Sequence, residues 1–94
     1  MFEITKTDDG VIHLEGRFDA AQVDRARSFF DGITTSHIID FSQLAYIASA
    51  GLGLLFATQK RLVDAGEAFK LTGLNPHIRE IFQIAGFDNI FEIE

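Results

Sequence analysis

Ser49 is the residue with the most chemical potential in this 94-residue sequence. It stands between an apolar run typical of a strand and a helical pattern, so we expect it to be the N-cap of a helix. A hydroxyl there lies beside free N–H groups and the positive end of the helix dipole, which together stabilise an anion. The small neighbours Ala48, Ala50 and Gly51 leave the hydroxyl accessible to another protein. A purely structural capping role is the alternative interpretation.

The same segment resembles a hydrolase nucleophile elbow only in part. Ser49, Ala50 and Gly51 supply the second half of the G-x-S-x-G pattern, but Ile47 occupies the place of its first glycine. A chain of 94 residues also has little room for the sheet and loops that orient a histidine and an acid. Serine hydrolase chemistry is therefore a minor hypothesis. The two glycines around Leu52 match neither phosphate-binding loop pattern.

The residues that could bind a metal ion are dispersed along the sequence. His13, His37 and His77 have no i, i+4 pairing and no carboxylates at metal-ligand spacing, and the chain has no cysteine. We therefore expect no metal site and no cofactor. The 10 phenylalanines fall mostly on predicted core faces and are not interleaved with basic residues, which favours packing over base stacking.

Composition narrows the class of protein further. With 47% hydrophobic and 23% charged residues, the chain has a globular composition, and its length fits one domain over residues 1–94. A net charge of −6 has the wrong sign for nucleic acid or for an anionic membrane surface. No apolar run approaches the length of a membrane span, and no signal pattern opens the sequence, so we expect no membrane insertion and a cytoplasmic location.

Apolar periodicity predicts alternating strands and helices. Asp19 and the Asn75-Pro76 pair are the expected N-cap signals of two helices, and a D-G turn at Asp9-Gly10 predicts a hairpin. The run from His37 to Phe41 is typical of a central strand covered on both faces. The predicted strands are Phe2 to Thr7, Val11 to Leu14, His37 to Phe41 and Ala68 to Thr72, and Ile90 to Ile93 is expected to form a terminal strand or a short docked tail. The predicted helices are Ala20 to Phe30, the segment from Ser49 to Ala65, and Pro76 to Ala85.

The second predicted helix has an apolar residue on its polar side. Counting 100° per residue, the buried face would contain Leu52, Leu55, Phe56, Gln59, Leu62 and Val63. Leu54 would then be exposed, which suggests an interface. Together the elements predict an α/β fold, a small mixed β-sheet packed with helices.

The segment from Asp40 to Leu55 resembles the signature of the STAS domain family, the anti-sigma factor antagonists. Three flanking segments extend the resemblance over essentially the whole chain: Gly16 to Asp19, Gly73 to Pro76, and Ile81 to Phe87. The resemblance implies a single STAS-like domain that is a non-enzymatic regulator.

The resemblance also implies a mechanism, partner switching. A family antagonist binds a serine kinase that is also an anti-sigma factor, and thereby frees the sigma factor for transcription. Phosphorylation of the serine two residues before the Gly-Leu-Gly turn, here Ser49, switches the antagonist off, and a PP2C-type phosphatase restores it. The residues expected to bind the partner are Asp19, Ala48, Gly51, Leu52 and Leu54.

One residue departs from the antagonist pattern. The position before the phosphorylated serine is commonly Asp in the family, and here it is Ala48. This keeps an alternative open, a STAS subunit of an ABC-type lipid transporter, in which the same face would bind an ABC ATPase subunit without phosphorylation.

Overall fold

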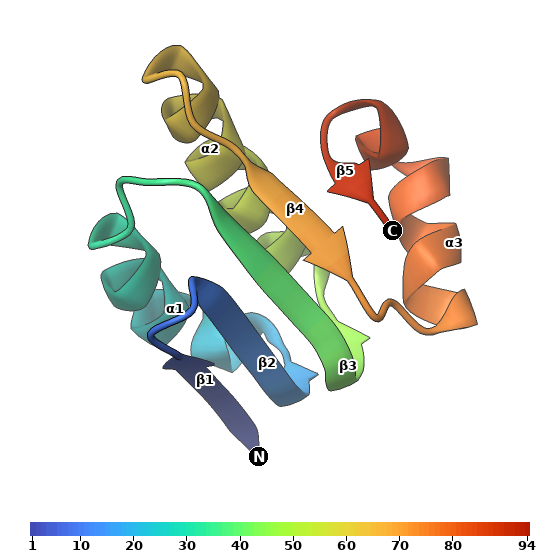
Figure 1. Cartoon of the computed structure of the whole chain (residues 1–94). Coiled ribbons are helices and arrows are strands. Elements are labelled where there is room, and N and C mark those ends of the chain that lie inside the picture. Colours follow the sequence, from blue (N-terminus) through green and yellow to red (C-terminus); the bar gives the residue numbers. More distant parts are fainter.

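Five strands form one sheet in which their order in space, β1-β2-β3-β4-β5, is their order along the chain. The computed structural model describes residues 1–94 (Figure 1). β1 and β2 pair antiparallel across the predicted hairpin, and the other neighbouring strands pair parallel, so the predicted mixed sheet is confirmed. The strands are β1 (Phe2–Lys6), β2 (Val11–Phe18), β3 (His37–Ile47), β4 (Phe69–Thr72) and β5 (Glu92–Ile93). The helices are α1 (Val23–Asp31), α2 (Ser49–Asp64) and α3 (Pro76–Ile84), with short 3-10 turns η1 (Ala20–Gln22) and η2 (Phe87–Asn89).

All three helices cover the same face of the sheet. Each follows one parallel strand and precedes the next, and right-handed crossovers that step in one direction along a sheet place their helices on one side. Figure 1 shows α1 and α2 behind the sheet and α3 beside β4 and β5. The prediction that the central strand is covered on both faces is therefore wrong, and Ile38 of β3 is 38% exposed on the opposite side.

The core lies between the helices and the inner side chains of the strands. Aromatic pairs connect the layers: Phe30 of α1 meets Phe69 of β4 edge to face at 5.8 Å, and Phe41 of β3 meets Phe82 of α3 at 5.8 Å. All four rings are buried. Edge-to-face pairs of this kind add to the stabilisation that burial alone provides. Most of the phenylalanines therefore serve packing, as predicted.

The predicted helix signals at Asp19 and Asn75 are confirmed. The Asp19 carboxylate accepts a hydrogen bond from the Ala21 N–H at 3.1 Å, and the Asn75 side chain accepts from the Ile78 N–H at 2.8 Å. The first helical segment differs slightly from its prediction, since it begins with the 3-10 turn η1 before α1. At the other end of α1, Arg61 of α2 donates to the carbonyls of Ile33 at 2.8 Å and Phe30 at 2.9 Å. This guanidinium links the two helices.

The buried face of α2 is rotated from the predicted one. Leu54 is 8% exposed and belongs to the core, so the prediction that it is exposed is wrong. Phe56 and Val63, predicted to be buried, are instead 36% and 54% exposed. The prediction took Leu52 as the centre of the buried face, but Leu52 is only partly buried at its margin. No helix of the structure is both long and apolar enough to cross a membrane.

The uncovered face of the sheet is polar and carries paired charges. His13 of β2 and Asp40 of β3 are register partners, and their side chains lie 3.1 Å apart. Partial burial alone would raise the pKa of Asp40, but hydrogen bonds from Ser42 and His13 outweigh it and hold the pKa below its ordinary value. The guanidinium of Arg17 lies over the Tyr46 ring, 4.4 Å from its centre. These pairs explain how this face remains stable in water without a helix over it.

Candidate functional site

The candidate site lies where β2 and β3 end side by side. Phe18 and Ile47 are register partners at these ends, and the Ala48 N–H donates to the Phe18 carbonyl at 2.8 Å. Asp19 and Ala48 therefore follow the carboxyl ends of two neighbouring parallel strands, at the same end of the sheet. Ser49 follows directly as the first residue of α2. The fold thus brings Asp19 into the region of Ser49, although they are 30 positions apart in the sequence.

Ser49 is predicted to be the N-cap of α2, but in the structure it is the first helical residue. Ala48, with extended backbone angles, is the N-cap, and no side chain caps the helix. The prediction was wrong by one residue because the hydrogen bond from the Ala48 N–H to the Phe18 carbonyl continues the pairing of β3 with β2 and holds Ala48 in an extended conformation. The first intrahelical bond runs from the Leu52 N–H to the Ala48 carbonyl at 3.0 Å, so the three preceding N–H groups have no partner within the helix. The Ser49 side chain is exposed beside them.

Gly51 lets α2 begin this close to the sheet. A Cβ at this position would lie 3.1 Å from Cγ1 of Ile47 and 3.3 Å from the Phe18 ring. Because both neighbours are core residues, only glycine fits without a displacement. Gly51 is itself buried, so it supports the site from below rather than offering a side chain to a partner.

The accessible surface around Ser49 differs from the predicted one. Leu54 is buried in the core and is therefore not part of the accessible surface, whereas Leu52 remains partly accessible. Phe56, which the sequence analysis assigned to the core, is exposed two helical turns beyond Ser49. Its spacing of seven from Ser49 is the signal that could have identified it, since residues i and i+7 share one side of a helix.

Asp19 and two of the three histidines make other contacts. The Asp19 carboxylate accepts a hydrogen bond from the Ala21 N–H. His13 is paired with Asp40 on the open face, and His37 contacts the Thr35 carbonyl. No hydrogen bond joins Ser49 to any of the three histidines, so the hydrolase hypothesis gains no support from the geometry. What the arrangement offers is an exposed hydroxyl at a helix N-terminus with free N–H groups, a place suited to a covalently attached anion.

Comparison with known proteins identifies the protein family. A family model described as "Mlab, STAS domain" matches residues 2–92. The chain therefore belongs to the STAS domain family, which confirms the resemblance inferred from the segment around Ser49.

The chain is also similar to particular proteins and solved structures. It is 36% identical over 74 residues to BtrV of Bordetella bronchiseptica, named as an anti-sigma factor antagonist; the match covers 79% of this chain and 58% of that protein. Among solved structures, the chain is similar to the phosphorylated form of SpoIIAA, a Bacillus cell fate determinant (TM-score 0.73, 21% identity, covering 100% of this chain and 91% of that one). It is also similar to an anti-sigma factor antagonist of Thermotoga maritima (TM-score 0.82, 20% identity, covering 98% and 84%). These two similarities show the fold.

Proposed function

We propose that the protein is an anti-sigma factor antagonist that acts by partner switching, with Ser49 as its reversible phosphorylation site. The observation that carries the proposal is the position of Ser49, an exposed hydroxyl in the first turn of α2 beside N–H groups without helical partners. The partner is a serine kinase that is also an anti-sigma factor, and a PP2C-type phosphatase reverses the modification. The names of BtrV and of the SpoIIAA structure support this assignment. In this scheme the protein is a regulator and not an enzyme.

A phosphate on Ser49 would act on the partner rather than on the fold. It would add about −1.5 to −2 charges, and the N-terminus of α2 favours negative charge by about 0.3–1 kcal/mol. No side chain of the chain needs to move, because none caps this helix end. Buried unpaired against a docked partner, the same charge would cost several kcal/mol. Phosphorylation therefore releases the partner while the domain stays folded.

The proposed docking surface surrounds this hydroxyl. It consists of Asp19 and Ala48 at the strand ends and of Leu52 and Phe56 on the accessible side of α2. Gly51 contributes by allowing the close approach of α2 to Phe18 and Ile47.

Two variants of Ser49 test the proposal. Ser49→Asp is expected to weaken binding to the kinase at least tenfold, on the order of 1.4 kcal/mol, while the unfolding free energy stays equal or rises slightly, since the new charge suits the helix dipole. Ser49→Ala is expected to bind like wild type but to gain no phosphate when incubated with ATP and a lysate of the native cell, measured by intact-mass spectrometry. Ser28→Asp, at an exposed position in the last turn of α1, is the matched control for the added charge and should bind the kinase like wild type. Equal kinase binding by Ser49→Asp and wild type would contradict the proposal.

A second function is supported by Ala48. Where antagonists of the family commonly carry Asp before the serine, this chain has a methyl group, which favours constitutive docking over a switch. The alternative is a STAS subunit of an ABC-type lipid transporter, with an ATPase subunit on the same surface. A pull-down from the native cell separates the two: a kinase together with a sigma factor supports the first function, and an ATPase together with a permease supports the second.

A further inference from the structure

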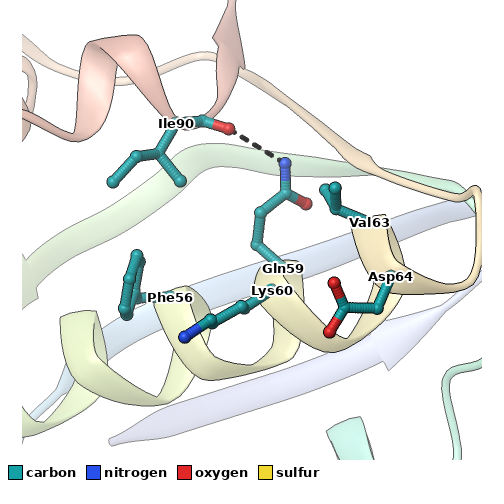
Figure 2. A pocket seen from close by; sticks show the side chains of 6 residues that line it. All are labelled: Phe56, Gln59, Lys60, Val63, Asp64 and Ile90. Carbon is teal, nitrogen blue, oxygen red and sulfur yellow. Dashed lines mark hydrogen bonds between the residues drawn. The ribbon is translucent and has the colours of Figure 1, made fainter.

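The exposed side of α2 continues past Phe56 into an apolar groove at the far end of the helix. The groove has a volume of about 290 Å³ (Figure 2). Its apolar walls are Val63 and Phe56 of α2, and Ile90, which is 37% exposed and follows η2. These three residues are half of the six large apolar side chains that the structure exposes, and their position in one concave place makes the groove a candidate contact surface.

Internal bonds hold the groove open. The Gln59 amide nitrogen donates to the Ile90 carbonyl at 3.0 Å, drawn as a dashed line in Figure 2, and the Gln59 amide oxygen accepts from the Phe69 N–H at 2.8 Å. Gln59 is buried, so both bonds are protected from water. The Phe56 ring stacks on Phe87 with 5.5 Å between the ring centres. The walls therefore come from two segments fixed to each other, and binding needs little rearrangement.

Two charges on the groove are unpaired. Lys60 and Asp64 are exposed and lie one turn apart on α2, and the ion pairs of the chain all involve other residues. Figure 2 shows the Lys60 ammonium group extending along the helix toward Phe56, away from the Asp64 carboxylate. An occupant that paired both charges would present an acid to Lys60 and a base to Asp64.

We propose that the occupant is a second copy of this chain, with its α2 antiparallel to the first, forming a weak homodimer. In a two-fold arrangement Lys60 of each copy faces Asp64 of the other, so one helix supplies both halves of the required charge pattern. The midpoint between these residues is position 62, and Val63 lies only about 1.5 Å along the helix axis from it. The most exposed apolar side chain of α2 thus meets its own copy near the symmetry axis. A parallel arrangement would oppose Lys60 to Lys60.

The interface is small and leaves Ser49 free. A stable complex buries about 800 Å² per partner, more than a six-residue groove provides, and the net charge of −6 on each copy opposes association. The dimer is therefore transient. Ser49 lies 13 residues from the symmetry axis, or about 20 Å along α2, so the proposed dimer leaves Ser49 free, although it shares Phe56 with the proposed docking surface.

Charge reversal tests the dimer through a mixing experiment. Wild type should show an average mass in sedimentation equilibrium that rises from micromolar to millimolar concentration. Lys60→Asp alone and Asp64→Lys alone should each dimerise about tenfold more weakly, because both contacts become like-charged. An equimolar mixture of the two variants should regain association, since each mixed contact again joins opposite charges.

The control mixture combines Lys6→Asp with Asp31→Lys, which give the same net charges at exposed positions outside α2. It should associate like wild type, and circular dichroism should show all four variants folded. A wild-type protein that stays monomeric at millimolar concentration would overturn the proposal. So would a mixture of the α2 variants that associates no more than either variant alone, which would leave the groove to another partner.

Discussion

Gly51 and Gly53 lie two residues apart in α2, yet replacement by alanine should change the free energy of unfolding in opposite directions. A Cβ at Gly53 would have no heavy atom within 4 Å, so alanine there adds only its helix propensity. Alanine exceeds glycine by about 0.8–1 kcal/mol in a helix interior. Gly53→Ala should therefore stabilise the protein by nearly that amount.

At Gly51 the same methyl group meets the core. It would lie 3.1 Å from Cγ1 of Ile47 and 3.3 Å from the Phe18 ring, and these side chains are 3% and 0% exposed. Neither neighbour is the free end of a flexible side chain, so both must shift against close packing. Overpacking of this kind costs about 1–3 kcal/mol, and the gain in helix propensity offsets about 0.5–1 kcal/mol of it near a helix end. Gly51→Ala should therefore destabilise the protein by about 1 kcal/mol, within a range of about 0–2.5 kcal/mol.

Urea unfolding at neutral pH measures both variants. The transition midpoint should rise for Gly53→Ala and fall for Gly51→Ala, with an unchanged dependence on denaturant in both. A midpoint that rises equally in the two variants would refute the reasoning, because it would mean that α2 can move away from Phe18 and Ile47 at no cost. The contact that positions Ser49 would then be a loose one.

Two further predictions concern polar contacts. The pKa of Asp40 is lower in the folded chain than in the unfolded one, so its stabilising contribution is complete above about pH 4 and is lost as the pH falls through the folded pKa. The difference in unfolding free energy between wild type and Asp40→Asn should thus be larger at neutral pH than near pH 3, and an equal difference at both would contradict the assignment. Arg61→Ala should destabilise the protein by about 1–2 kcal/mol, since the carbonyls of Phe30 and Ile33 lose their donors. Lys60→Ala, one residue earlier and exposed, is the control and should stay within about 0.5 kcal/mol of wild type in urea unfolding.

Local chemistry made parts of this fold predictable. Asp19 and Asn75 accept hydrogen bonds from N–H groups two and three residues ahead, so their capping roles are written in a few neighbouring positions. The hairpin between β1 and β2 follows in the same way from the D-G turn before Val11. Each of these predictions needed no knowledge of distant parts of the chain.

The predictions were wrong where tertiary packing determines which side of a helix or strand is buried and where a helix begins. The side on which a helix is buried depends on what it packs against, so the apolar pattern of α2 did not distinguish Leu54 from Phe56. Ile38 appeared to need cover on both faces, but the direction of the crossovers leaves one face of the sheet bare. The position of Ser49 within α2 depends on the bond from Ala48 to Phe18, a residue 30 positions away.

The agreement between strand order and chain order has a consequence for how the protein is made. The antiparallel pair β1-β2 can form as soon as the first 18 residues are available, and β3, β4 and β5 each add to the edge that was completed last. No strand has to insert between two that are already paired, and no earlier pairing has to break. The domain can therefore assemble in the direction of synthesis, one strand and one helix at a time, with the two-residue strand β5 closing the growing edge at the end.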